Sequence, residues 1–308
     1  MCAIMARMAH TDSPYIGRFA PSPTGPLHFG SLVAVLGSYL QARMNHGQWH
    51  LRMEDLDTPR CMPGMAGNIL HTLERFGFEW DGAVVYQSQR LPAYRAALDQ
   101  LQATGMVYGC ACTRREIADS SLHGIEGAVY PGTCRDGVPP NRTALAQRVR
   151  TDNTLICFDD ALQGRVCQQL QTDLGDFVVL RADGIFAYQL AVVVDDAQLD
   201  VTEVVRGADL LASTPRQIYL QNLLRLPNPA YLHLPVALNA MGQKLSKQTN
   251  AAALNPRNPL PDLRRAMTFL SHPVPDEVDT LDEFWGWARS AWRPQQLLPM
   301  GNMARVGR

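Results

Sequence analysis

A turn rich in proline and glycine, placed between a strand-like and a helix-like segment, constrains the fold of this chain more than any other feature. The turn covers residues 21–31, PSPTGPLHFGS. Residues 15–20 before it are mostly apolar or aromatic and end at a proline, which predicts a short strand. In residues 27–45 after it, apolar side chains recur at spacings of three and four, which predicts a helix. We therefore expect a strand-to-helix connection in an α/β sheet.

The beginning of that predicted helix favours the binding of an anion. Its first backbone N–H groups have no partner within the helix, and the helix dipole places partial positive charge there. Gly25 and Gly30 lack Cβ atoms, so a base or a phosphate can approach the main chain. His28 lies in the first turn. The stretch contains neither GxGxxG nor a Walker loop, so it predicts a nucleotide site of another kind.

Two motifs, in this order, resemble the class I aminoacyl-tRNA synthetases. PSPTG-x-LHFG is similar to the "HIGH" signature of that class in the form of its glutamyl and glutaminyl branch, although Ser31 replaces the second histidine. Residues 244–248, KLSKQ, follow a strand-like run and a Met-Gly turn, and they resemble the "KMSKS" loop. Either stretch alone is compatible with a loop that serves only chain geometry. The two together favour the resemblance.

Composition agrees with a globular enzyme and says little about partners. The chain has 308 residues, of which 46% are hydrophobic and 19% charged, which is typical of soluble proteins with one or more sizeable cores. We find neither a signal peptide nor an apolar run of the ~20 residues needed to span a bilayer, so we expect a cytoplasmic protein without membrane contact. The odd number of cysteines, 7, predicts reduced thiols rather than disulfides. The net charge of −1 neither supports nor excludes RNA binding.

Strand-like and helix-like segments alternate in the first third of the chain, which predicts a parallel sheet. Residues 49–54 alternate as a half-buried strand does, and helices are predicted at 68–76 and 91–104. The resemblance implies a Rossmann-type α/β catalytic domain of a class I synthetase, interrupted by an inserted zinc-bearing α+β subdomain and followed by a short helical C-terminal region. The corresponding segments are 1–109 with 187–248, then 110–186, and then 249–308.

Three cysteines in the predicted insertion are candidate zinc ligands. Cys110-x-Cys112 is followed across a loop by Tyr130-x-x-x-Cys134, and thiolates are soft donors that suit a tetrahedral Zn²⁺ site. The alternative is three unrelated buried thiols. Ordinary coordination chemistry favours His123 as the fourth ligand. One small branch of glutamyl-type synthetases carries C-x-C…Y-x-x-x-C and uses the tyrosine, so the resemblance assigns Tyr130.

The charges of free glutamate indicate what its site requires. Two carboxylates need planar cations, and one ammonium needs an anion or an aromatic oxygen. Arg18 and Arg206 are candidates for the carboxylates, and Glu54 and Tyr188 for the ammonium. Arg206 has an alternative role in an ion pair with the acidic residue three positions before or after it. The resemblance assigns six residues to the glutamate pocket: Arg18, Ala20, Ser22, Glu54, Tyr188 and Arg206.

The resemblance also implies the reaction. The glutamate carboxylate attacks the α-phosphate of ATP in line, and positioning and charge neutralisation account for the rate. His28 and Gly30 would hold the nucleotide. Lys247, and less directly Lys244, would neutralise the leaving pyrophosphate, and Mg²⁺ accompanies ATP.

Only residues 249–308 follow KLSKQ, whereas ordinary glutamyl-tRNA synthetases continue with a long helical region that reads the anticodon. This short form resembles the glutamyl-queuosine tRNA(Asp) synthetases. The resemblance implies a monomer that activates L-glutamate without tRNA and attaches it to queuosine in the anticodon stem-loop of tRNA(Asp). The alternatives are a minimal glutamyl-tRNA synthetase that charges a tRNA 3′ end, and a non-enzymatic, zinc-bearing RNA-binding paralogue.

Overall fold

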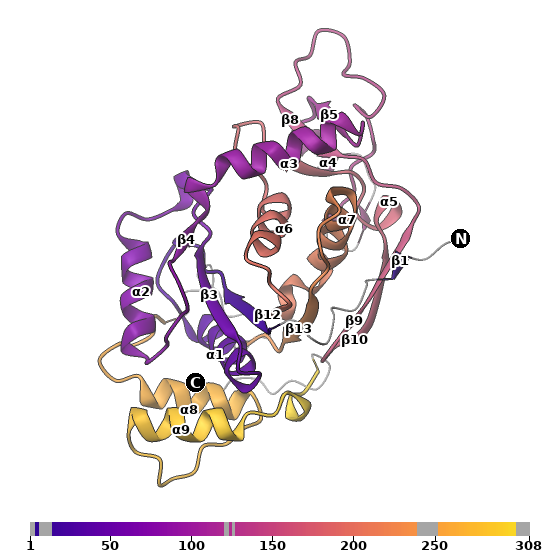
Figure 1. Cartoon of the computed structure of the whole chain (residues 1–308). Coiled ribbons are helices and arrows are strands. Elements are labelled where there is room, and N and C mark those ends of the chain that lie inside the picture. Colours follow the sequence, from indigo (N-terminus) through magenta and orange to yellow (C-terminus); the bar gives the residue numbers. More distant parts are fainter. Residues whose placement is uncertain (1–3, 6–13, 120–122, 125–126, 239–251, 300–308) are drawn as a thin grey trace.

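The structure is a computed structural model, and it describes residues 4–5, 14–119, 123–124, 127–238 and 252–299. The first half of the nucleotide-binding fold consists of three parallel strands and the helices that connect them (Figure 1). Strand β2 pairs with β3, and β3 pairs with β4. In chain order the elements are β2 (Ile16–Phe19), α1 (Phe29–Met44), β3 (Gln48–Met53), α2 (Met65–Arg75), β4 (Val85–Tyr86) and α3 (Leu91–Ala103).

The second half adds two more parallel strands, β12 and β13, which pair over five residues each. Its elements are α6 (Tyr188–Gln198), β12 (Glu203–Gly207), α7 (Thr214–Leu224) and β13 (Ala230–Leu234). Thr202 joins the two halves, because its backbone N–H donates to the carbonyl of Ile16 at 2.9 Å and its hydroxyl accepts the Ile16 N–H at 2.9 Å.

The strands consequently lie in the order β4-β3-β2-β12-β13. Strand β2, which comes first of the five along the chain, lies in the middle. This order reverses direction between β2 and β12. Ligands of open parallel sheets bind at such a switch point, beyond the carboxyl ends of the strands. The predicted α/β class with a Rossmann-type parallel sheet is confirmed.

The segment between the halves forms a separate antiparallel sheet of β5 (Val107–Cys110), β8 (Ala146–Val149) and β11 (Phe177–Leu180). It lies at the upper end of the molecule in Figure 1, beside α4 (Arg114–Ala118). Two further short strands, β6 (His123–Gly124) and β7 (Gly127–Ala128), pair with each other. The remaining elements are β9 (Leu155–Asp160), β10 (Gly164–Gln169) and α5 (Leu170–Asp173), and β1 (Ile4–Met5) pairs with β9.

Strand β9 also pairs with β13, through Asp160 and Tyr231. A strand from the predicted insertion therefore extends the parallel sheet beyond β13. The division into domains at residues 110 and 186 stays a prediction.

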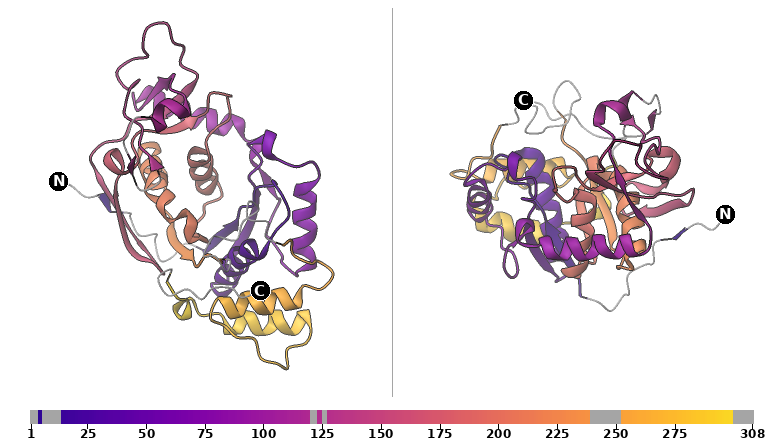
Figure 2. Two further views of the ribbon diagram at one scale, coloured as in Figure 1. Left: turned by 180° about the vertical axis from the view of Figure 1, so that it is seen from behind. Right: turned by 90° about the horizontal axis from the view of Figure 1, so that it is seen from above.

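The two C-terminal helices, α8 (Leu260–Phe269) and α9 (Leu281–Ala291), pack on the outer face of the first half (Figures 1 and 2). The indole N–H of Trp285 donates to the carbonyl of Phe76 at 3.1 Å, and that of Trp292 donates to Gln41 at 3.0 Å. Both indoles are buried. The aromatic residues of this region therefore belong to the same hydrophobic core as α1, β2 and β3.

The prediction of reduced thiols is wrong for one pair of cysteines. Cys157 and Cys167 form a disulfide across the antiparallel strands β9 and β10. The two residues are opposite each other in the register, with 4.2 Å between their Cα atoms. Counting cysteines failed here because a count contains no information on strand pairing.

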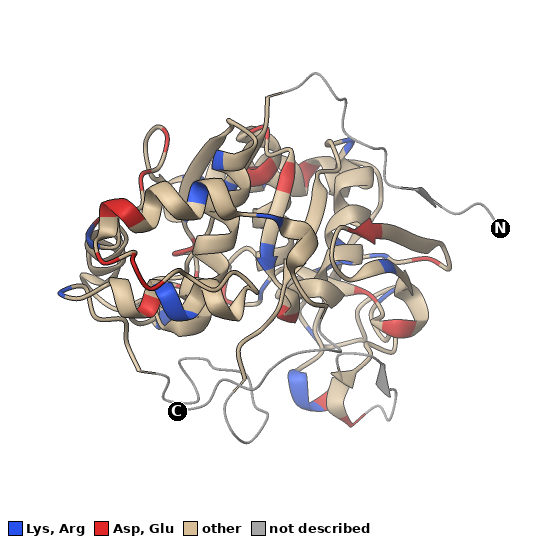
Figure 3. Cartoon of the chain, turned by 90° about the horizontal axis from the view of Figure 1, so that it is seen from below, with Lys and Arg blue, Asp and Glu red and all other residues tan. Residues whose placement is uncertain are grey.

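None of the helices in the described part of the chain combines the length and the apolarity that crossing a membrane requires. Positive and negative residues are interspersed along the elements in Figure 3. This distribution agrees with the net charge of −1.

Candidate active site and metal centre

A pocket of about 1050 Å³ lies at the switch point of the sheet. It is lined, though not by Gly25, by the described residues that the resemblance assigned to glutamate and ATP: Arg18, Ala20, Ser22, His28, Gly30, Glu54, Tyr188 and Arg206. These residues come from segments as far apart in sequence as β2 and β12. Lys244 and Lys247 lie outside the described residues, so their roles stay predictions.

His28 is the N-cap of α1 and closes a capping box with Ser31. The Nδ1 atom of His28 accepts the backbone N–H of Ser31 at 3.3 Å, and the Ser31 hydroxyl accepts the backbone N–H of His28 at 3.5 Å. The helix consequently begins at Phe29, two residues later than predicted. Because Nδ1 is an acceptor, a neutral His28 carries its proton on Nε2. Ser31, which replaces the second histidine of the signature, thus stabilises the beginning of the helix.

Asp196 holds two arginines in place beneath the pocket. Its Oδ1 atom accepts from Arg18 Nε at 3.1 Å and from Arg52 Nη1 at 2.6 Å. Arg52, which is fully buried, also reaches Glu54 at 3.4 Å. Burial alone would raise the pKa of Asp196, but the charges of Arg18 and Arg52 outweigh it and lower that pKa. Asp196 is therefore an ionised carboxylate that fixes the position of Arg18.

Glu54 lies in the same network with a different electrostatic balance. Burial raises its pKa more than the positive charges of Arg52 and Arg18 lower it. A ligand cation that met this carboxylate would offset the cost of burying it. That property suits the predicted contact of Glu54 with an ammonium group.

Asp195, the neighbour of Asp196, lies 3.7 Å from Arg52 Nε and makes its hydrogen bonds to α3 and the segment before it. It accepts from Gln87 at 2.7 Å, from Arg90 at 2.6 Å and from the hydroxyl of Tyr94 at 2.8 Å. These bonds connect α6 to α3 and to the segment before it. The two adjacent carboxylates near the end of α6 thus connect this helix of the second half of the fold to the first half.

Arg206 donates hydrogen bonds to three side chains that are not carboxylates. Its Nε atom donates to His233 Nε2 at 3.0 Å, its Nη2 atom to the hydroxyl of Thr214 at 2.8 Å, and its Nη1 atom to the hydroxyl of Tyr188 at 3.4 Å. Glu203, three positions earlier, instead accepts from Tyr15 and Gln41 at 2.8 and 3.0 Å.

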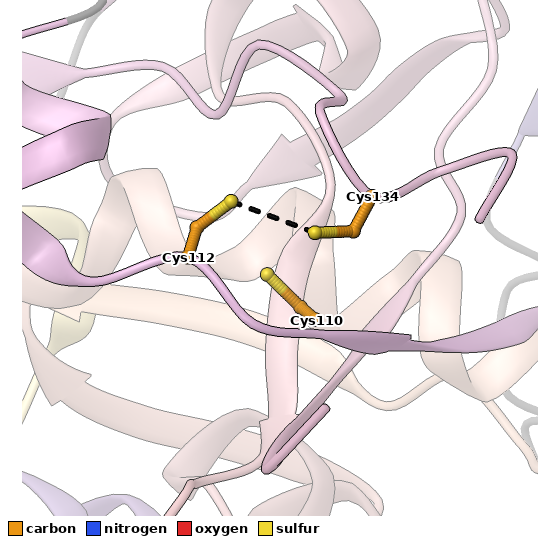
Figure 4. Close-up of side chains that lie close together, drawn as sticks. All are labelled: Cys110, Cys112 and Cys134. Atoms are coloured by element: carbon orange, nitrogen blue, oxygen red, sulfur yellow. Dashed lines mark hydrogen bonds between the residues drawn. The ribbon is translucent and has the colours of Figure 1, made fainter. Parts of the chain in front are cut away.

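The side chains of Cys110, Cys112 and Cys134 point toward one another (Figure 4). Their sulfur atoms all lie within 4.8 Å of one another. The hydroxyl of Tyr130 is 3.5 Å from Cys110 Sγ and 3.8 Å from Cys112 Sγ, and it accepts the backbone N–H of Cys134 at 2.8 Å. Three soft sulfur donors around one phenol oxygen suit a four-coordinate metal ion. The side chain of His123, the alternative ligand, lies outside the described residues.

Arg148 provides positive charge at this cluster. Its Nε atom donates to Cys110 Sγ at 3.3 Å, and its guanidinium lies 4.0 Å from the centre of the Tyr130 ring. Burial opposes ionisation of Cys110, but hydrogen bonds from Tyr130 and Arg148 outweigh it and lower the pKa of that thiol. Burial raises the pKa of Cys112 to about 11. The cluster therefore favours the thiolate of Cys110 and disfavours that of Cys112, and a bound cation would favour the ionised form of both.

A family model described as the catalytic domain of class I tRNA synthetases (E and Q) matches residues 16–258. A relative from Aromatoleum aromaticum named glutamyl-Q tRNA(Asp) synthetase is 59% identical over 290 residues, which are 92% of this chain and 92% of that protein. A protein of the same name from Dechloromonas aromatica is 59% identical over 285 residues, covering 91% of this chain and 95% of its own. The chain belongs to the glutamyl-Q tRNA(Asp) synthetase family. It is thus a ligase-type enzyme, as the motifs predicted.

Solved structures agree on the fold of this family. A glutamate tRNA ligase from Elizabethkingia meningosepticum, crystallised with its amino acid, aligns with a TM-score of 0.78 at 24% identity. The alignment covers 96% of this chain and 67% of the ligase. The class I catalytic fold expected for a glutamyl-Q tRNA(Asp) synthetase is therefore confirmed.

Sequence reasoning missed the residues that support this site from outside the pocket. They include Arg52, Asp160 and His233, all of them buried. The only signal available was a charged or polar residue within an otherwise apolar strand, as in LRME around Arg52 and YLHL around His233. Such residues are rarely buried without a partner, so they mark positions where one should be sought.

Proposed function

We propose that this protein activates L-glutamate with ATP, without tRNA, and transfers the glutamyl group to the queuosine base at the wobble position of tRNA(Asp). The observation that carries the proposal is the convergence of two arginines, a glutamate and a tyrosine on one pocket beside the beginning of α1. The name of the relatives supports the choice of acceptor.

The charges in the pocket suit the two ends of glutamate. Arg18 and Arg206 present guanidinium N–H groups, which only donate, to the carboxylates. Glu54 and the hydroxyl of Tyr188 would receive the ammonium. Ala20 and Ser22, on the turn after β2, line the same pocket and complete the proposed amino-acid site.

In the activation step, a carboxylate oxygen of glutamate forms a bond to the α-phosphorus of ATP. The bond from that phosphorus to the bridging oxygen breaks, and pyrophosphate leaves with the electron pair. His28 and Gly30 would hold the nucleotide phosphates at the positive end of α1. We assign charge neutralisation on pyrophosphate to Lys247 and Lys244, and Mg²⁺ accompanies ATP as part of the substrate.

In the transfer step, the acyl group passes from the adenylate to the modified base and AMP leaves. We infer that the enzyme acts as a monomer in the cytoplasm, where tRNA is found.

We propose that Cys110, Cys112, Tyr130 and Cys134 hold one structural Zn²⁺. The donor types and their mutual distances fit such a site. Bound zinc would cross-link the end of β5 to the loop that carries Cys134. None of the four residues lines the pocket, so the ion has no part in the chemistry proposed above.

Two measurements test the proposal. The first is glutamate-dependent exchange between ATP and pyrophosphate in the absence of tRNA. We expect exchange with the wild type and a loss of at least 100-fold in Lys247→Ala with an unchanged fold, because a lysine on the leaving group stabilises the transition state. A protein without exchange would support the non-enzymatic alternative.

The second measurement is labelling with radioactive glutamate of tRNA from cells with and without queuosine. We expect label only in queuosine-containing tRNA, and nuclease digestion should place it in the anticodon loop. Label at the 3′ end of either tRNA would instead identify a minimal glutamyl-tRNA synthetase.

A further inference from the structure

Behind Arg206 lies a buried Asp–His pair that does not line the pocket. Asp160, the last residue of β9, contacts His233 of β13 with 2.6 Å between Oδ2 and Nδ1, and both side chains are 0% exposed. The Oδ1 atom of Asp160 accepts the backbone N–H groups of Leu162 and Gln163 at 3.0 and 2.8 Å. The orientation of the carboxylate is therefore fixed by the turn that follows β9.

The contacts determine which nitrogen of His233 carries the proton. Arg206 Nε donates to His233 Nε2 at 3.0 Å, and a guanidinium has no lone pair to accept with. Nε2 must consequently be the acceptor, so the proton lies on Nδ1 and is donated to Asp160. If the proton were on Nε2, two donors would face each other at 3.0 Å.

This arrangement fixes the orientation of Arg206. Three of its N–H bonds are directed to His233, Thr214 and Tyr188. Within the described residues, the structure records no acceptor for the other two N–H bonds of the five in a guanidinium. Arg206 therefore offers only donors to a ligand in the pocket.

We propose that Asp160 and His233 are positioning residues that hold Arg206 as a donor-only receptor for the substrate carboxylate and so favour glutamate over glutamine. The inference deepens the proposed function and rests on it. A carboxylate has only acceptors and satisfies such a receptor. The carboxamide of glutamine would bring its NH₂ group against N–H donors, which leaves buried donors unpaired.

Burial keeps His233 in the neutral form that this role needs. It lowers the pKa of the imidazole, and the charge of Arg206 lowers it further, although Asp160 acts in the opposite direction. The imidazole is thus uncharged near pH 7 and can accept from Arg206.

The sharpest test is Asp160→Asn, which changes one oxygen to NH₂ and keeps the shape of the side chain. The amide oxygen would keep the bonds to Leu162 and Gln163, so its NH₂ would face His233 Nδ1. The proton of His233 would then move to Nε2 and face Arg206. We expect the KM for glutamate in ATP–pyrophosphate exchange to rise roughly 10- to 100-fold with kcat reduced less than about threefold, because hydrogen bonds to a charged ligand are lost. The preference for glutamate over glutamine in kcat/KM should fall by a similar factor.

His233→Gln and His233→Phe extend the test without changing Asp160. The glutamine carbonyl can replace Nε2 as the acceptor for Arg206, so its KM should rise less than that of the phenylalanine variant, which has no acceptor. The matched control is His272→Gln. His272 is also a buried histidine whose Nε2 accepts a backbone N–H, from Arg293 at 3.0 Å, but it lies beside Trp292 and away from the pocket. The His272→Gln variant should lose about as much stability as the His233→Gln variant, without a change in the KM for glutamate.

The tautomer itself can be read by NMR with ¹⁵N-labelled histidine, with His233 assigned by the signal that His233→Gln removes. We expect the Nδ1–H form in the wild type and the Nε2–H form in Asp160→Asn. An Nε2–H or doubly protonated His233 in the wild type overturns the inference. So does an unchanged KM in Asp160→Asn or, if that variant does not fold, equal KM values in the two His233 variants. A wild type that shows the Nδ1–H form but no glutamate-dependent exchange would contradict the proposed function instead.

Discussion

The pocket and the cysteine cluster differ in what holds their side chains in place. In the pocket, the protein itself pairs the buried charges, as when Asp196 holds Arg18 and Arg52 at 3.1 and 2.6 Å. In the cluster, the sulfur atoms of Cys112 and Cys134 lie 3.6 Å apart, and thiols make only weak hydrogen bonds. The geometry of the pocket is therefore a property of the folded chain, whereas that of the cluster would depend on the proposed ion. The predictions below test this difference.

The largest effect is expected from Asp196→Asn. This variant leaves the guanidinium groups of Arg18 and Arg52 without their shared counter-charge in a buried site. Breaking a buried ion pair in this way typically costs about 3–5 kcal/mol of folding free energy. We expect a loss of that order in urea denaturation and a loss of glutamate-dependent exchange of at least 100-fold.

Metal analysis of the same variant provides the comparison. Folded Asp196→Asn should keep the metal content of the wild type, because Asp196 has no contact with the cysteine cluster among the described residues. A folded variant that lost its metal would contradict the independence of the two regions.

Removal of one sulfur ligand should produce the opposite pattern. Cys112→Ser replaces a soft thiolate by a hydroxyl, and we expect zinc affinity to fall by roughly three orders of magnitude, about 4 kcal/mol. Exchange without tRNA should change less than about threefold, since the pocket does not contain the cluster. Zinc stoichiometry after dialysis against a chelator, measured beside the exchange rate, checks both halves. A wild type without metal would reject the zinc centre.

Sequence patterns predicted those parts of the molecule whose structure is determined by residues close to one another in the chain. The turn at residues 21–31, the helices α1 and α3, and the strands β2 and β3 follow from residues next to one another in the chain. The pocket residues were identified by motifs, because they lie near the ends of strands, in the turn after β2 or in the first turn of a helix.

Sequence patterns could not predict contacts that depend on which strands become neighbours. Asp160 and His233 are 73 positions apart, and nothing near either of them indicates the other. The disulfide between β9 and β10 and the position of β9 beside β13 have the same origin. Such contacts follow from sheet topology and register, which single-chain periodicity does not determine.

A smaller effect distinguishes the two candidates for the fourth zinc ligand. Tyr130→Phe removes only the hydroxyl that lies near all three cysteines, and we expect a loss of zinc affinity of about 10- to 100-fold. His123→Ala should leave the affinity within about twofold of the wild type. Competition with a chromophoric chelator measures both. The reverse order would move the ligand assignment from Tyr130 to His123.

The smallest effect is a pH dependence of stability that tests whether His233, which accepts from Arg206 behind the pocket, is uncharged in the folded protein. Burial lowers the pKa of folded His233, while an unfolded histidine titrates near 6.5. As the pH falls from 7.5 to 5.5, the unfolded chain binds a proton that the folded chain excludes, so this stabilising contribution is present above about 6.5 and is lost below it. One such proton corresponds to about 1 kcal/mol over this interval.

The unfolding free energy of the wild type should therefore decrease, between pH 7.5 and 5.5, by about 1 kcal/mol more than that of His233→Gln. His272, whose pKa burial also lowers, is present in both proteins, as is the cysteine cluster, so their contributions cancel. Equal pH slopes would mean that folding leaves the pKa of His233 unchanged. A wild type that gained stability relative to His233→Gln on acidification would mean that folded His233 is protonated, and the support of Arg206 would then be charged like that of Arg18.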